Sequence, residues 1–412
     1  MDADEMAALC RAVAEIAAEP LARARTLPAA AYTSPAFYRT EERKLFRAGW
    51  LCIAHVSEVP AAGDCLAVDM LNEPLVVTRD AGGQIHVLSR VCSHRNMDMF
   101  PLADGFPRRF QAAHLICAYH SWSFEMDGRL RSCPQMQEAE GFERRDWPLI
   151  KLRSGVWNGF VFVNFDGMAP PLAEIYDDLD PLLAPWRIAE MQIAISMDWD
   201  CAFNWKVMVE NWMESYHHIG AHRITLNPIM PGQNTWTEPE HPYFVHAHLP
   251  FTEALRAKID ATKARGGQPT AFRPIAEASD AQSKEWGLFV GHPFFMFLTM
   301  PDRLLWYRLF PLAPDHCRLQ TMTLISPEAM AAPNIAAALE EETRLLRDFH
   351  AEDMEVNRAM QLGLNSRFTR HGRLSHLEEP VWLIQRHLAA RLADRWPQRA
   401  VRAPYYGPGA AA

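Results

Sequence analysis

The sequence lacks any apolar run long enough to cross a bilayer as a helix. It also lacks a cluster of basic residues, and its formal net charge of -9 at pH 7 argues against a nucleic-acid-binding surface. The first 20 residues are acidic and amphipathic, unlike a signal or transit peptide, and predict a surface helix that ends at Pro20. We therefore expect a globular cytoplasmic protein with no membrane or nucleic-acid partner.

Cysteine is scarce, with eight residues in a chain of 412. Without secretory features, these cysteines indicate reduced thiols or metal ligands and not disulfides. Six of them have no partner at ligand spacing and are interpreted as structural thiols: Cys10, Cys52, Cys65, Cys133, Cys201 and Cys317. The length of the chain suggests two domains, one of them interrupted by the other.

Short β-like runs separated by Gly-rich and Pro-rich turns begin near Leu51 and continue to Val156–Asp166, which predicts a small antiparallel domain. Inside it, Cys92 and His94 form one C-x-H pair, and Cys117 and His120 form a C-x2-H pair. A Cys2His2 zinc site is one interpretation of these pairs. The other is a Rieske 2Fe–2S centre, in which two Cys hold one iron and two His hold the other. The C-x-H-R and C-x-Y-H-x-W patterns favour the Rieske centre.

The stretch 204–222 predicts a helix whose apolar residues recur at helical spacing. Its other face carries Glu210, Asn211, Glu214 and His217, and the stretch closes with His218 and His222. Buried carboxylate and imidazole groups need partners, and a non-heme iron is one such partner. Ideal helical spacing favours His218 with His222, whereas a break at Gly220 would allow His217 instead. Hydrogen-bonded core histidines are the plainer alternative.

With these motifs, the chain resembles the large (alpha) subunit of Rieske non-heme iron oxygenases over roughly Phe37 to Leu392. The resemblance implies that the cluster ligands are Cys92, His94, Cys117 and His120. The sequence departs from the family pattern at three positions of these loops: Asn96 and Ser121 stand where Gly is common, and Ala118 where Pro is common. The segment between His94 and Cys117 is also longer than usual, with a predicted surface excursion at Phe100–Arg109.

The resemblance also implies a mononuclear iron held by His217, His222 and Asp353, the last from a late helix at Phe349–Leu364. It chooses His217 over His218, and leaves Glu352 and Glu355 as solvated or supporting carboxylates. Glu214 and Asn211 are the predicted catalytic residues beside the metal. In the family, the acid at the position of Glu214 lies between this iron and a Rieske histidine of a neighbouring subunit, here His94 or His120.

The predicted fold class is α+β, with an antiparallel Rieske domain inserted near the N-terminus of a helix-grip catalytic domain. The expected boundaries are 1–40 for an N-terminal helix and connector, 41–166 for the Rieske domain and 167–412 for the catalytic domain. A short helix is expected at Glu41–Trp50, and Ala254–Lys284 is expected to be a lid without regular structure. Six residues are candidates to line the pocket, although a core position is the more common role of such side chains: Met208, Trp212, Trp236, Phe294, Phe297 and Met300.

The resemblance implies an oxygenase that uses dioxygen to mono- or dihydroxylate, or oxidatively demethylate, a small organic substrate. Electrons would come from NAD(P)H through a ferredoxin or flavin reductase, since the chain has no dinucleotide or flavin motif of its own. A homotrimer, with or without a beta subunit, is expected. Glu214 stands where ring-dihydroxylating members of the family usually have Asp. In this respect the chain is similar to the branch of the family that oxidises quaternary ammonium compounds such as carnitine and glycine betaine. The competing hypotheses are a non-catalytic Rieske electron-transfer protein and a ligand-binding helix-grip protein with a structural metal.

Overall fold

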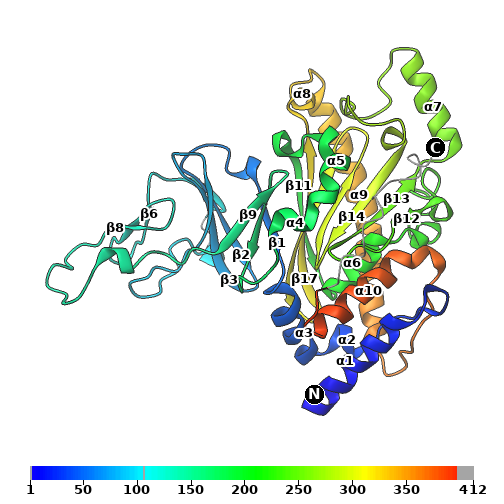
Figure 1. The fold of residues 1–412 in the computed structure, drawn as a ribbon. Helices are drawn as coiled ribbons and strands as arrows, with labels where there is room; N and C mark the ends of the chain where they lie inside the picture. The colour runs from blue at the N-terminus through cyan, green and yellow to red at the C-terminus, as the bar shows by residue number, and fades with distance from the viewer. Residues whose placement is uncertain (1, 105–106, 397–412) are drawn as a thin grey trace. The chain divides into compact units, whose positions relative to one another are not determined.

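The computed structural model describes residues 2–104 and 107–396, which divide into two compact units (Figure 1). One unit is Trp50–Leu172, and it interrupts the other, which consists of Met1–Gly49 and Ala173–Ala412. Within the described ranges, no helix is both long enough and apolar enough to span a membrane. The predicted α+β class, with an antiparallel β unit placed early in a chain that otherwise forms a helix–sheet unit, is confirmed.

Three small antiparallel sheets form the unit Trp50–Leu172, with strand orders β1-β10-β9, β4-β3-β2-β5 and β6-β7-β8. The strands are β1 (Leu51–His55), β2 (Asp64–Met70), β3 (Glu73–Arg79), β4 (Ile85–Ser89), β5 (Arg109–Gln111), β6 (Leu115–Ile116), β7 (Ser123–Phe124), β8 (Leu130–Ser132), β9 (Arg153–Trp157) and β10 (Phe160–Asn164). Asn158 and Gly159, with φ of 46° and 82°, make the two-residue turn between β9 and β10. Two positive φ values give the turn a twist that matches its flanking strands.

The other unit is built on a seven-stranded antiparallel sheet of order β11-β17-β16-β15-β14-β13-β12. Its strands are β11 (Gln192–Cys201), β12 (Trp236–Thr237), β13 (Phe244–Pro250), β14 (Glu285–Gly291), β15 (Phe295–Thr299), β16 (Leu304–Ala313) and β17 (His316–Ile325). The helices of this unit, with α4 beginning at the boundary, are α1 (Ala3–Ala18), α2 (Ala30–Thr33), α3 (Pro35–Glu41), α4 (Leu172–Tyr176), α5 (Asp180–Leu183), α6 (Trp205–Met213), α7 (Glu253–Ala264), α8 (Pro327–Met330), α9 (Ile335–Leu364) and α10 (Glu379–Leu392).

Helix α9 is unusual because the face that it buries is largely polar. Its buried residues recur every three or four positions and therefore form one stripe: Glu342, Leu346, His350, Asp353, Asn357 and Gln361. Buried polar groups are costly unless they are hydrogen-bonded, and each polar side chain of the stripe makes at least one hydrogen bond. Arg303 binds Glu342 at 2.6 Å near one end, and the Asn204 backbone donates to Gln361 at 2.9 Å near the other. The stripe therefore fixes the rotation of α9 about its own axis.

Three local predictions are wrong. The helix predicted over 204–222 ends at Met213, and a separate 3-10 turn follows at Tyr216–Ile219. The segment expected to be an irregular lid begins with the twelve-residue helix α7, which is capped by the Thr252 hydroxyl. The short helix expected at Glu41–Trp50 starts earlier, with α3 at Pro35, and continues as a π-helical turn to Phe46.

Candidate metal centres

Two matching loops carry the predicted cluster ligands in the unit Trp50–Leu172. The Asn96 N–H donates to the Cys92 carbonyl at 3.0 Å, and the Ser121 N–H donates to the Cys117 carbonyl at 3.0 Å. Asn96 and Ser121 close these loops in the left-handed region, with φ of 58° and 59°. Glycine adopts this conformation without steric cost, which accounts for the glycine that is common at these two positions in the family pattern.

The four predicted ligands are arranged as two buried thiols and two more exposed imidazoles. Cys92 and Cys117 belong to an apolar core cluster, whereas His94 is half-buried and His120 is exposed. The two imidazole rings lie 4.6 Å apart, and the His94 ring stacks on Trp122 at 4.6 Å. Burial and the neighbouring Cys117 raise the pKa of the Cys92 thiol, so a pair of thiolates at this site needs compensating positive charge.

The four side chains fit a two-iron cluster better than a single zinc ion. Among the residues that the structure describes, two groups bring three or more ligand atoms within 4.8 Å of one another, and neither contains a cluster residue. One tetrahedral ion would need all four atoms that close together. In a two-iron cluster, two Cys bind one iron and two His bind the other, so the four ligand atoms need not all lie this close together.

The second centre gathers side chains from the segment after α6 and from the buried stripe of α9. His217, His222 and Asp353 place one ligand atom each within 4.8 Å of the others. Asp353 Oδ1 lies 3.0 Å from His222 Nε2 and 3.6 Å from His217 Nε2. Two imidazoles and one carboxylate are the donor set of non-heme Fe(II) sites. The donor set and its convergence fit a mononuclear iron.

A second carboxylate supports each of these imidazoles from its far side. His217 Nδ1 lies 2.7 Å from Glu214 Oε1, and His222 Nδ1 lies 2.7 Å from Glu352 Oε2. Such partners fix the tautomer, so that Nε2 carries the lone pair offered to a metal. Burial alone would lower the pKa of His222, but the hydrogen bonds to Asp353 and Glu352 raise it above its usual value.

His218 lies outside this group, although ideal helical spacing favours it. Its Nδ1 donates to the Met230 carbonyl at 2.8 Å, and burial lowers its pKa to about 4. The spacing argument fails because the backbone leaves the helix at Glu214, with φ of -115° and ψ of 152°. The prediction that Glu214 and His217 share one helical face is therefore wrong, because the helix ends before both of them.

The helix does not break at Gly220, as the sequence suggested. The glycine that packs against the observed break is Gly232. A Cβ at Gly232 would lie 2.4 Å from the Ser215 carbonyl oxygen, so the chain passes too close for any side chain. Gly220 follows the 3-10 turn with φ of -101°, a conformation open to other residues. The close approach brings together segments that are 17 positions apart, which spacing within one helix does not reveal.

Asn211 and Glu214, the predicted catalytic residues, are placed differently. The side-chain oxygen of Asn211 accepts from Asn357 Nδ2 at 3.2 Å, which ties α6 to the polar stripe of α9. Glu214 instead holds His217 twice, since its Oε2 also accepts from the His217 backbone N–H at 3.0 Å. Of the other acids near Asp353, Glu352 contacts His222 and Glu355 is exposed.

Aromatic residues from the sheet and from α6 reach the same region, and sequence patterns did not single out Tyr307 of β16. The Tyr307 hydroxyl hydrogen-bonds His350 Nε2 on α9, and the Trp212 ring lies 3.9 Å from the Tyr307 ring. Trp199 stacks on His350 at 5.6 Å. These contacts identify the face of the sheet that faces the triad.

The opposite face of the sheet carries other pocket candidates. Phe297 pairs with Trp306 while its neighbour Met296 pairs with Tyr307, so Phe297 and Tyr307 point to opposite faces. Trp236 pairs with His248 on β13 and lies on the same side as Phe297. Neither residue therefore points toward Tyr307.

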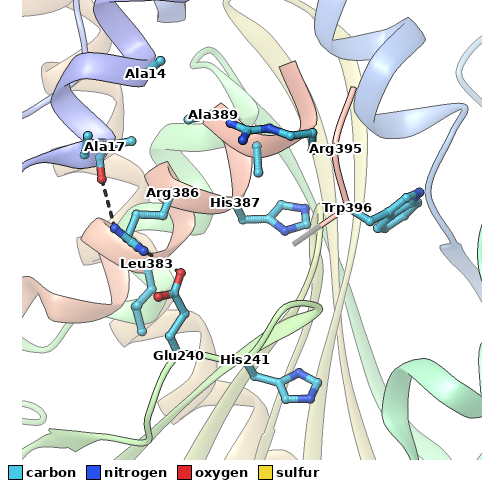
Figure 2. A pocket seen from close by; sticks show the side chains of 12 residues that line it. Ala14, Ala17, Glu240, His241, Leu383, Arg386, His387, Ala389, Arg395 and Trp396 are labelled. Carbon is cyan, nitrogen blue, oxygen red and sulfur yellow. Dashed lines mark hydrogen bonds and ion pairs between the residues drawn. The ribbon is translucent and has the colours of Figure 1, made fainter. Parts of the chain in front are cut away.

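A hollow of about 780 Å³ lies elsewhere in this unit, between α1 and α10 (Figure 2). Arg386 reaches across it, donating to Glu240 at 2.9 Å and to the Ala17 carbonyl at 3.4 Å. None of its lining residues is a predicted ligand. Size alone therefore does not mark the reactive site in this molecule.

Two family comparisons agree with the two centres. Residues 188–394, half of the chain, match the family "Ring hydroxylating alpha subunit (catalytic domain)", and residues 49–148 match "Rieske [2Fe-2S] domain". The fold and its two centres thus define a Rieske iron protein with a separate catalytic domain. The chain belongs to the ring-hydroxylating alpha-subunit family, whose domains imply a 2Fe–2S cluster and a mononuclear iron.

Individual relatives carry several different names. The chain is 32% identical over 210 residues to a glycine betaine monooxygenase oxygenase subunit of Chromohalobacter salexigens, covering 51% of this chain and 46% of that protein. It is 30% identical over 197 residues to biphenyl 2,3-dioxygenase subunit alpha of Rhodococcus jostii, covering 46% and 41%. The chain spans about half the length of the first relatives that it matches.

Solved structures show the same fold over nearly the whole chain. The quaternary ammonium Rieske monooxygenase CntA in complex with L-carnitine is similar with a TM-score of 0.72 and 22% identity. The superposition covers 92% of this chain and 98% of that one. At this identity, the likeness supports the fold and leaves the substrate open.

Proposed function

We propose that this chain is the oxygenase component of a Rieske system, which oxidises a small organic substrate with dioxygen. The observation that carries the proposal is the convergence of His217, His222 and Asp353, with each imidazole held by a further carboxylate. A purely electron-transferring Rieske protein has no use for this second donor set. An iron bound there would supply the open coordination positions and redox chemistry for dioxygen.

The protein's own groups would orient and shield this chemistry. Glu214 and Glu352 keep Nδ1 of each imidazole protonated, which leaves Nε2 of both rings free for a metal. His222 and Asp353 are buried, whereas His217 is partly exposed. Tyr307 and Trp212 supply ring surface on this side of the sheet. The site thus combines a fixed donor set with an aromatic wall.

Electrons would enter at the exposed side of the cluster, from a ferredoxin or flavin reductase that draws on NAD(P)H. Ile116 and Tyr119, beside the cluster ligands Cys117 and His120, are 54% and 53% exposed, and apolar surface of this kind suits docking. We infer a homotrimer in which Glu214 links the two centres of neighbouring subunits, as the family resemblance implies. In the described structure no disulfide joins any two of the eight cysteines, which is in keeping with the cytoplasmic location that we propose.

For the substrate, we propose a quaternary ammonium compound. A glycine betaine monooxygenase oxygenase subunit is among the relatives, and Glu214 stands where ring-dihydroxylating members have Asp. Ring faces such as those of Tyr307 and Trp212 bind a trimethylammonium group by cation–π attraction. Biphenyl dioxygenase is similar at comparable identity, so an arene is the alternative substrate.

The test is dioxygen uptake by the iron-loaded protein with a surrogate reductase and NADH. Glycine betaine, carnitine and choline are compared with biphenyl and naphthalene, and products are identified by NMR and mass spectrometry. We expect substrate-dependent uptake with at least one of the three ammonium compounds, and none from the Asp353→Ala variant with its cluster spectrum intact. Turnover of the arenes alone would overturn the substrate class. Uptake that survives in Asp353→Ala would overturn the assignment of the site.

A further inference from the structure

A second buried group of potential metal ligands lies apart from the triad. Glu238, His246 and His248 bring one ligand atom each within 4.8 Å of the others, and their exposed fractions are 3%, 2% and 5%. None of them belongs to either centre described above. Carboxylates buried this deeply are costly unless their charge is balanced by a nearby cation.

The sequence creates this group through strand alternation. His246 and His248 are two residues apart on β13, so both side chains point to the same face of the sheet. His246 pairs with Phe289, which pairs with Phe297, on the face opposite to Tyr307. The group therefore faces away from the iron triad. Glu238 follows β12, and its N–H donates to the His246 carbonyl at 2.9 Å.

The geometry around His248 matches that of a metal-bound imidazole. Its Nε2 lies 3.2 Å from Glu238 Oε1, and its Nδ1 lies 2.8 Å from Glu285 Oε1. Two atoms bound to one tetrahedral zinc at about 2.1 Å lie about 3.4 Å apart, close to the first distance. The second contact is the carboxylate support that metal-bound histidines receive, and His222 has the same arrangement with Asp353 and Glu352.

Flanking rings hold both imidazoles in place. His248 stacks on Trp236 at 3.7 Å with an interplanar angle of 6°, and His246 stacks on Phe289 at 4.0 Å. With neutral imidazoles, Glu238 and Glu285 carry two negative charges, which one divalent cation neutralises. Protonation of His248 between the two carboxylates would neutralise only one of these charges. This difference favours a dication.

We propose that Glu238, His246 and His248 bind a structural divalent cation of the zinc type, with Glu285 orienting His248. The ion would join the end of β12 to β13 and β14 at this edge of the seven-stranded sheet. Two imidazoles and a carboxylate are a donor set that zinc accepts, with the fourth tetrahedral position left for water. The burial of all three side chains favours a structural role.

The experiment measures zinc retained by the full-length protein that carries its cluster. Protein is treated with a chelator, incubated with excess Zn²⁺, freed of unbound metal and analysed by elemental mass spectrometry. The Asp353→Ala background removes the competing triad site. We expect one zinc per chain in Asp353→Ala, none when Glu238→Gln is added, and one when Glu240→Gln is added instead. Glu240 is the control because it is a neighbouring acid paired with Arg386.

Two further measurements keep the test decisive if Glu238→Gln fails to fold. Glu285→Gln leaves the three ligands intact and should weaken zinc binding 10–100-fold. Zinc-edge X-ray absorption of Asp353→Ala should show nitrogen and oxygen neighbours with two imidazoles and no sulfur. Absence of retained zinc in Asp353→Ala, or equal zinc in the Glu238→Gln and Glu240→Gln variants, would refute the site.

Discussion

The contact between His222 and Glu352 offers a sharp test of the iron centre. Glu352 Oε2 lies 2.7 Å from His222 Nδ1 and accepts from the Thr225 hydroxyl at 2.7 Å. Removing the carboxylate of a metal-bound histidine costs 10–100-fold in metal affinity, or about 1.4–2.7 kcal/mol. The Glu352 side chain is 28% exposed, and water can replace part of its contribution. We therefore expect about a tenfold loss for Glu352→Ala.

A graded series separates charge from hydrogen bonding. Glu352→Gln keeps an oxygen that can accept from His222 Nδ1 but loses the charge. Its Fe(II) affinity should therefore lie between those of wild type and Glu352→Ala. Glu355→Gln is the matched control, because Glu355 lies on the same helix, three residues further, and is exposed. It should bind iron as wild type does.

The assay is competition for Fe(II) with a chromophoric chelator at pH 8, under anaerobic conditions. The 2Fe–2S absorption spectrum is recorded in parallel, so that loss of the cluster is not mistaken for loss of mononuclear iron. Equal iron affinity in Glu352→Ala and Glu355→Gln, with cluster and fold intact, would refute the role given to Glu352. It would also weaken the assignment of His222 Nε2 as the metal-facing nitrogen.

Three further outcomes follow from the structure. Ser121→Gly should raise the free energy of unfolding by about 1 kcal/mol, because Ser121 adopts a φ of 59°, which glycine adopts without steric cost. Thermal denaturation of the protein with its cluster intact measures this free energy, and an unchanged or lower value would contradict the prediction. Burial raises the pKa of Glu210 to about 7, so the folded state holds a proton that the unfolded state releases above its lower pKa. Wild-type stability should therefore fall by up to about 3 kcal/mol as pH rises from about 4.5 to 7, and Glu210→Gln should lose this slope in denaturant titrations at each pH. His218→Asn should retain mononuclear iron while His217→Asn loses it, measured as iron per chain; the reverse result would restore the ideal-helix assignment.

Much of the β structure was predictable from short-range patterns. Runs of β-branched and aromatic residues between turn residues predicted β1–β4 and the β stretch at Val156–Asp166, since strand alternation and turn chemistry are local properties. That this stretch is a hairpin of β9 and β10 was not predicted. The spacing of Cys92, His94, Cys117 and His120 likewise favoured a two-iron cluster before any fold was known. These four assignments, like those of the triad, stay predictions until metal is measured.

What the sequence did not reveal at the second centre has one physical cause, which is contact between distant segments. Nothing within 204–222 announces that the helix ends at Met213, because the break is packed against Gly232. The sequence left Glu352 as either a solvated or a supporting carboxylate, and only the approach of His222, which lies 130 positions away, favours the supporting role. A local signal did exist for the second group of ligands. His246 and His248 are two residues apart, the spacing for one face of a strand, but neither belongs to a ligand set predicted from the sequence.

The buried polar stripe of α9 has a consequence for how this chain tolerates changes in length. Inserting one residue in the helix between Glu342 and Asp353 would rotate the two ends by about 100° relative to each other and separate them by a further 1.5 Å. Either Arg303 would lose Glu342, or His222 would lose Asp353. Insertions and deletions that spare function should therefore collect in exposed loops, while the length of α9 between these anchors stays constant.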